Sequence, residues 1–252
     1  MISAIRARIR QGHRTMRYPL EPVVLPERFR GYPKFDKSAC TNGCQKCADA
    51  CPFGAIACTP SLSMDLGKCL FCTECVQACP QGAISFSNDS VLAVNKREDL
   101  IVSADSERVM AKALSDKLLS LFGRSIKFRE VSAGGCNACE ADTNVLSTIG
   151  WDLGRFGIQF VASPRHADGL WVTGPVTLHM VEALKITHDA IPAPKIVIAC
   201  GACAINGGPY INSPEANNGV DGMIPVDLYI PGCPPHPVTI LDGLLRLLNK
   251  IK

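Results

Sequence analysis

The sequence of 252 residues predicts two folds in series: an α+β domain built around a duplicated cysteine motif, then an α/β domain with an open parallel sheet. The first is predicted by two cysteine runs that end alike, in CPFGAI at Cys51 and CPQGAI at Cys79. The second is predicted by short apolar runs that alternate with helical patterns after residue 125, as in a parallel sheet covered by helices.

Composition narrows the class of protein. A chain of this length can bury a hydrophobic core that is stable without disulfide bonds. Its 14 cysteines are clustered along the sequence, which favours metal binding in a reducing compartment over disulfide bonds. No run approaches the roughly 18 to 20 apolar residues of a membrane span, and no signal peptide is evident, so we expect a soluble, cytoplasmic protein. A net charge of +3 and an aromatic content of 6% argue against nucleic acid as a partner.

Residues 1–32 are predicted to form an N-terminal strap. In residues 2–16, Ile2, Ile5, Ile9 and Met16 follow one side of a possible helix, while arginines occupy the remainder. This helix is either a solvated terminus or a segment that docks onto a partner subunit at a membrane surface. The stretch RYPLEPVVLPERFRG contains three prolines and should run extended over a surface.

Residues 33–90 contain both cysteine runs. The second run has the spacing C-x2-C-x2-C-x3-C-P of bacterial two-cluster ferredoxins, which this portion resembles. In that pattern three thiolates of one loop hold one 4Fe-4S cluster and the fourth, before the proline, reaches the neighbouring cluster. We therefore expect a first thiol set of Cys40, Cys44, Cys47 and Cys79, and a second thiol set of Cys69, Cys72, Cys75 and Cys51.

The first run departs from that spacing, because Thr41, Asn42 and Gly43 fill a gap that normally holds two residues. Gly43 makes the larger loop feasible. A zinc site is the alternative interpretation, but structural zinc favours two separated C-x2-C pairs over two runs of four cysteines. Cys58 is expected to be a core residue beside the second cluster.

Residues 91–125 are predicted to be a linker without cysteine that contains a connecting helix. The stretch DSERVMAKALSDKLLSLFG offers an N-cap at Asp105 or Ser106, helical apolar spacing, and a stop at Gly123.

Residues 126–252 are predicted to be the α/β domain, with a flavodoxin-like open sheet. The expected strands are KFREVS, IQFVAS, GLWVTG, KIVIAC and VDLYIPG, and the clearest helices are TLHMVEALKITHDA and PVTILDGLLRLLNKI. Ligands of such sheets lie beyond the carboxyl ends of the strands. Those ends carry GGCNACEAD, SPRHADG, TGPVT, CGACAINGG and PGCPPHP.

A third thiol set is expected at these strand ends, formed by Cys136, Cys139, Cys203 and Cys233. Cys200 is the competitor of Cys203, although a cysteine at the end of an apolar strand is more often a core residue. Nearby glycines allow the backbone to close over a cluster and to direct N–H groups at its sulfurs; they are Gly134, Gly135, Gly201, Gly207 and Gly208.

The motifs GGCNACE, SPRHAD, TGPVT, CGACAINGG and VDLYIPGCPPHP together resemble the small, electron-transferring subunit of membrane-bound, energy-converting nickel-iron hydrogenases. They are similar also to the related subunit of respiratory NADH:quinone oxidoreductase, which usually has adjacent cysteines where this chain has the spaced pair Cys136 and Cys139. The resemblance implies that the third set holds the cluster nearest the active site. The ferredoxin portion resembles the two-cluster subunit of the same complexes, so two subunits are fused here.

The resemblance implies a subunit with three 4Fe-4S clusters and no catalytic residue of its own, peripheral at the cytoplasmic face of the cell membrane. Implied partners are a large subunit that carries nickel-iron, integral membrane subunits, and a low-potential donor such as ferredoxin, formate dehydrogenase or carbon monoxide dehydrogenase. One alternative is a related complex without nickel-iron that reduces quinone or another acceptor, and another is a freestanding electron carrier. Glu140 is expected to make either a proton or partner contact or local hydrogen bonds, and His166 and His236 are expected to be packing or interface residues.

Overall fold

The computed structural model describes residues 2–12, 14–41 and 43–251. Its largest element is a parallel sheet of five strands in the order β10-β9-β8-β6-β7. These strands are β6 (Ile126–Ser132), β7 (Ile158–Phe160), β8 (Gly169–Thr173), β9 (Ile196–Cys200) and β10 (Leu228–Ile230). Numbered along the chain from β6, the order is 2-1-3-4-5, the flavodoxin-like arrangement, and all five predicted strands are confirmed.

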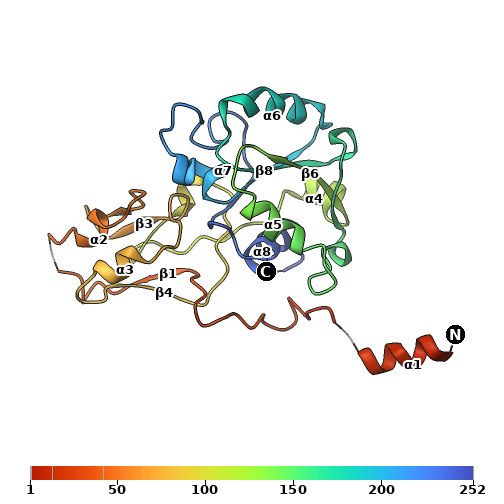
Figure 1. The fold of residues 1–252 in the computed structure, drawn as a ribbon, viewed down its shortest axis with the longest axis horizontal. Coiled ribbons are helices and arrows are strands. Elements are labelled where there is room, and N and C mark those ends of the chain that lie inside the picture. Colours follow the sequence, from red (N-terminus) through yellow and green to blue (C-terminus); the bar gives the residue numbers. More distant parts are fainter. Residues whose placement is uncertain (1, 13, 42, 252) are drawn as a thin grey trace.

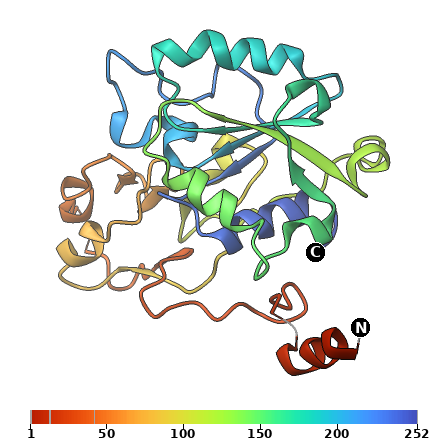
Figure 2. The ribbon, with the colours of Figure 1, turned by 45° about the vertical axis from the view of Figure 1, so that its right-hand side comes forward.

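Helices cover both faces of this sheet (Figures 1 and 2). One face packs against α6 (Leu178–Ala190) and α7 (Ala202–Asn206), and the other against α5 (Ala138–Val145) and α8 (Pro237–Leu247). The strands are buried on both sides because their side chains alternate: Leu170 and Val172 join one core, and Trp171 joins the other.

The ferredoxin portion contains two small antiparallel sheets. Strand β1 (Pro33–Phe35) pairs with β4 (Ile84–Phe86), and β3 (Ser63–Asp65) pairs with both β2 (Ile56–Ala57) and β5 (Ile101–Ser103). Its short helices are α2 (Lys46–Asp49) and α3 (Glu74–Ala78). The 3-10 helix η1 (Arg97–Leu100) leads into β5, so part of the segment predicted to be a linker pairs with the ferredoxin portion.

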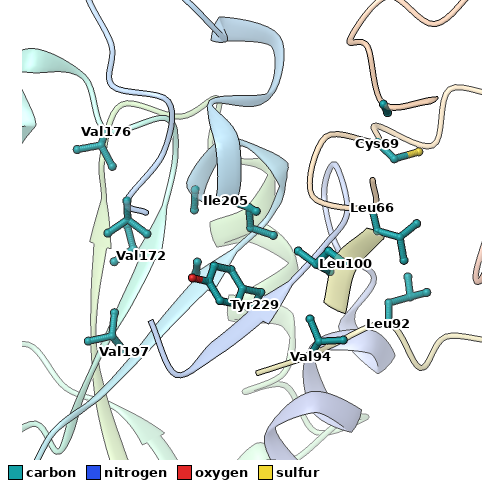
Figure 3. Packing of buried hydrophobic residues seen from close by; sticks show 14 of the residues in the cluster. Leu66, Cys69, Leu92, Val94, Leu100, Val172, Val176, Val197, Ile205 and Tyr229 are labelled. Carbon is teal, nitrogen blue, oxygen red and sulfur yellow. The ribbon is translucent and has the colours of Figure 1, made fainter. Parts of the chain in front are cut away.

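One buried core joins the two portions. Figure 3 shows Leu66 and Leu100 of the ferredoxin portion beside Ile205 and Tyr229 of the α/β domain. An antiparallel bridge between Val94 and Tyr229 adds the intervening segment to the edge strand β10. The two cysteine-bearing portions are therefore packed against each other over apolar side chains.

The connecting helix is shorter than predicted. Helix α4 spans Asp116–Phe122, whereas residues 106–115 are not helical. In that stretch the N–H of Ala111 donates to the carbonyl of Ala93, and the N–H of Leu114 donates to that of Leu247. Backbone bonds to distant segments take the place of helical ones here, so this part of the prediction is wrong.

The N-terminal strap carries an exposed helix and an irregular tail. Helix α1 (Ile2–Gln11) has no buried residue, and Ile2, Ile5 and Ile9 are 68%, 55% and 77% exposed. Met16 lies beyond this helix, contrary to the prediction, and its N–H donates to the carbonyl of Gly150. The part of the chain that the structure describes has no helix long and apolar enough to cross a membrane.

The tail of the strap is fixed to the α/β domain through Tyr18. Its hydroxyl donates to Asp242 Oδ1 at 2.8 Å, and its carbonyl accepts from Arg155 at 2.7 Å. Asp242 is buried and also accepts from Arg246 of the same helix, α8. The strap therefore continues from an unburied helix into a segment held by polar contacts.

Candidate functional site

Three cavities are each lined by all four cysteines of one predicted thiol set. The first set, the second set and the third set surround spaces of about 300, 310 and 300 Å³. In residues 2–12, 14–41 and 43–251, no three or more His, Cys, Asp or Glu side chains are arranged to hold a single metal ion. Each set thus encircles a space instead of converging on a point.

The first and second sets share a repeated local geometry. After each run, the chain turns at a glycine in the left-handed region, Gly54 at φ 59° and Gly82 at φ 66°. The N–H of Ala55 then donates to Cys51 Sγ at 3.3 Å, and the N–H of Ala83 donates to Cys79 Sγ at 3.2 Å. The two cysteines that precede proline therefore share one local geometry, and each lines the cavity formed with three cysteines of the other run.

Left-handed residues also shape two of the C-x2-C turns that begin a helix, whereas Gln45, before α2, has φ −120°. Thr73, at φ 72°, follows Cys72 and precedes α3, which carries Cys75. Asn137, at φ 68°, follows Cys136 and precedes α5, which carries Cys139. Positive φ is uncommon for such residues, and here it places the first thiol and the first helical turn around the same cavity.

The third set gathers at the carboxyl ends of the parallel strands. Cys136 follows β6, Cys203 follows β9 on α7, and Cys233 follows β10. Two glycines allow the backbone to lie close to the thiols of this set. A Cβ at Gly201 would lie 2.5 Å from Cys139 Sγ, and one at Gly208 would lie 2.8 Å from Cys203 Sγ.

Cys200 lies elsewhere. It is fully buried at the end of β9 among apolar residues of the core formed with α5 and α8, and it does not line the cavity of the third set. Cys58 is also apart from the position predicted for it. Its Sγ lies 3.8 Å from Cys47 Sγ, so it adjoins the first set and not the second.

Burial governs the protonation of these thiols. It raises the pKa of Cys69 and of Cys203 to about 12, and that of Cys75 to about 11. These three thiols are therefore neutral at neutral pH unless a metal is bound, and metal binding must displace their protons. The N–H of Phe71 donates to Cys69 Sγ at 3.3 Å and acts in the opposite direction, because it lowers the pKa of that thiol.

The polar residues near the third set have partners. Glu140 is buried, lines the cavity, and accepts a hydrogen bond from Thr173 Oγ1 at 2.7 Å. His236 caps α8 by accepting from the N–H of Val238, and its ring packs against Phe29, so its packing role is confirmed. His166 is exposed at the end of the 3-10 helix η3 (Pro164–His166).

Sequence reasoning missed Glu130 of β6. Its Oε1 is buried without a hydrogen-bond partner among the described residues. Burial, with a smaller contribution from Glu140, raises the pKa of Glu130 to about 7. An acidic residue in the middle of the apolar strand IKFREVS was the available signal.

Comparison with known proteins identifies the family. Residues 136–247 match the family of the 20 kDa subunit of NADH ubiquinone oxidoreductase, and residues 63–85 match the 4Fe-4S binding domain. The probable membrane-bound hydrogenase subunit mbhJ of Pyrococcus furiosus is 43% identical over 147 residues, which are 58% of this chain and 88% of that protein. The chain belongs to this family of oxidoreductase subunits.

Other similarities extend over the same half of the chain. An uncharacterized protein of Methanocaldococcus jannaschii is 44% identical over 127 residues, 50% of this chain and 85% of its own length. A chain of an archaeal membrane-bound sulfane sulfur reductase has a TM-score of 0.47 at 35% identity, covering 54% of this chain and 75% of that one. A chain of an NAD+-reducing [NiFe]-hydrogenase has a TM-score of 0.41 at 26% identity, and the match covers 51% of this chain and 94% of that one.

Family membership confirms the resemblance inferred from the sequence motifs. The chain is an iron-sulfur, electron-transferring subunit of an oxidoreductase complex, and the α/β domain with its parallel sheet is the part that carries the family match.

Proposed function

We propose that this chain conducts electrons through three 4Fe-4S clusters, one in each thiol set, between a low-potential donor and a catalytic partner subunit. The observation that carries the proposal is that twelve cysteines divide into three sets of four around three cavities of similar size. Such a cluster supplies one-electron redox chemistry when bound. The crossed sets, with Cys79 in the first and Cys51 in the second, support a two-cluster ferredoxin arrangement.

The second and third sets adjoin each other, which supports a route from first to second to third. Leu70 and Phe71, from the loop of the second set, line a groove of about 680 Å³ together with Cys233. Arg30 donates to the carbonyl of Phe71 at 3.0 Å and so holds this loop in place. We keep the division into residues 1–32, 33–90, 91–125 and 126–252 as part of the proposal, although β5 of the third segment pairs with the ferredoxin portion. The contact of Arg30 with Phe71 supports a role for the strap in joining the two cluster-bearing portions.

The partner that we propose is a large subunit with a nickel-iron site, where protons are reduced or hydrogen is oxidised. The relative from Pyrococcus furiosus is named as a membrane-bound hydrogenase subunit, and the spaced pair Cys136 and Cys139 supports this assignment over a quinone-reducing complex. We also propose integral membrane partners and a peripheral position at the cytoplasmic face of the membrane. The exposed isoleucines and the arginines of α1 support contact with that surface.

The alternative is a related complex without nickel-iron that passes electrons to quinone or another acceptor. The sulfane sulfur reductase named above belongs to a respiratory membrane complex, so this kind of assembly is represented among similar proteins. Nickel analysis of the purified complex separates the two: stoichiometric nickel supports the hydrogenase, and its absence supports the alternative.

Iron content and two cysteine variants test the proposal. The anaerobically purified chain should contain about twelve irons. Cys203→Ala should lose or convert one cluster and leave the other two paramagnetic signals, while Cys200→Ala, a trimmed core residue, should keep all three. Four or eight irons after full reconstitution, or loss of a cluster in Cys200→Ala but not in Cys203→Ala, would contradict the assignment.

A further inference from the structure

The first thiol set has a fifth thiol beside it. Cys58 Sγ lies 3.8 Å from Cys47 Sγ, within contact of a proposed cluster ligand. Cys58 also lines an open cavity of about 800 Å³ together with Cys40 and Cys44, which face the first-set cavity from the other side. A fifth cysteine therefore adjoins the four that line the first-set cavity, although Cys58 does not line that cavity itself.

Cys58 and Cys40 both line this open cavity. The two cysteines reach this place on different supports. Cys40 belongs to the enlarged surface loop, next to exposed Thr41, whereas Cys58 directly follows β2, which is paired with β3.

We propose that Cys58 is a reserve ligand of the first cluster, able to take the iron that Cys40 otherwise holds. The proposal rests on the proposed function only in assuming a cluster in the first set. In the exchange, a bond forms between iron and Cys58 Sγ and the bond to Cys40 Sγ breaks. The proton of the Cys58 thiol passes to the departing Cys40 thiolate, and no electron is transferred.

The enlarged loop gives the exchange a structural reason. Its extra residue lets Cys40 be displaced while Cys44 and Cys47, the latter on α2, keep their positions. Cys58 needs no new backbone path, because it already contacts Cys47 from the adjoining strand. The first site would thus retain four thiolates when its most loosely supported ligand is lost.

Iron content and paramagnetic resonance of the full chain test the exchange. Cys40→Ala should keep about twelve irons and three signals, with the signal of the first cluster changed in shape. Cys40→Ala/Cys58→Ala should fall to about eight irons. Cys40→Ala/Cys200→Ala, which removes the core cysteine instead, should match Cys40→Ala and serves as the control.

Two results would overturn the proposal: a fall to about eight irons in Cys40→Ala itself, or retention of about twelve in the variant that lacks both Cys40 and Cys58. A failure of the proposed function is distinct, because it would leave the unaltered chain with fewer than about twelve irons.

Thiol alkylation gives an independent measurement. In the cluster-loaded unaltered chain, iodoacetamide should modify Cys58, which lines the open cavity, while the ligands are protected. In cluster-loaded Cys40→Ala, or in Cys40→Ser if the alanine variant does not fold, Cys58 should become protected until iron is removed. Continued modification of Cys58 in a variant that keeps the first cluster would refute its role as a ligand.

Discussion

Gly67 lies where the loop that leads to Cys69 packs closely against the helix that carries Cys203. A Cβ at this position would lie 2.8 Å from Ile205 Cγ2 and 2.9 Å from Arg97 Cζ, whereas carbon atoms in good contact lie about 3.5 to 4.0 Å apart. Arg97 cannot move aside freely, because its guanidinium donates two hydrogen bonds to Asp65, at 2.8 and 2.7 Å. Gly67→Ala must therefore displace Ile205, which is 1% exposed, or the loop itself.

We expect Gly67→Ala to lower the free energy of unfolding by about 1 to 3 kcal/mol, the usual cost of inserting a methyl group into a packed core. For a chain of this size each kcal/mol lowers the Tm by about 2 to 4 °C. Thermal unfolding of the cluster-loaded protein measures this change in Tm. The proposed cluster ligands are untouched, so iron content should stay at about twelve per chain.

A double-mutant comparison assigns the effect to the contact. Ile205→Ala removes Cγ2, so its combination with Gly67→Ala should cost about 1 kcal/mol less than the sum of the two changes. Ile205→Val keeps Cγ2 and is the matched control, in which most of the clash should persist. An unchanged Tm in Gly67→Ala, or equal coupling with both Ile205 variants, would refute the reasoning.

Three further predictions concern the anchor of the strap, a buried carboxyl group and helix α1. Tyr18→Phe removes a hydrogen bond to buried Asp242, so thermal unfolding should show a loss of about 1.5 to 3 kcal/mol, and a loss below about 0.5 kcal/mol would count against the anchor. Glu130, with a pKa of about 7 in the folded chain and about 4.3 when unfolded, binds a proton on folding between these values, so stability should fall as pH rises through this window. Glu130→Gln should abolish that fall in denaturant titrations from pH 5 to 8. Deleting residues 2–11 removes α1 alone, so iron should persist while cosedimentation with partner membranes weakens; full assembly of the truncated chain would contradict the docking role.

The sequence was most informative where one periodicity governs a whole element. All five parallel strands are predicted from apolar runs that end in small residues or proline. This pattern is clear because strands that are buried on both faces consist mostly of apolar residues. The division of the cysteines into three sets also followed from spacing and strand ends, and the structure brings each set around one cavity.

Predictions failed where distant contacts decide the local structure. Residues 106–115 have helical spacing, yet Ala111 and Leu114 bond to the carbonyls of Ala93 and Leu247, and Arg108 lies over the ring of Tyr32. Cys58 was placed beside the second set because it follows Cys51 closely in the sequence. The short strand β2 instead brings Cys58 next to Cys47 of α2. A strand of two residues has no sequence pattern by which it can be predicted.

The shared core explains how one chain can fix the distances between its proposed clusters. Leu66, which precedes Cys69, is packed in the same apolar cluster as Ile205, which follows Cys203, and Leu100 lies between them in Figure 3. The bridge from Val94 to Tyr229 ties the intervening segment to the edge of the sheet. Because these side chains are almost fully buried, the second and third sets cannot separate without exposing apolar surface, at about 25 cal/mol for each Å². The spacing of the two proposed clusters is thus set by folding of the chain, and not by the association of two subunits.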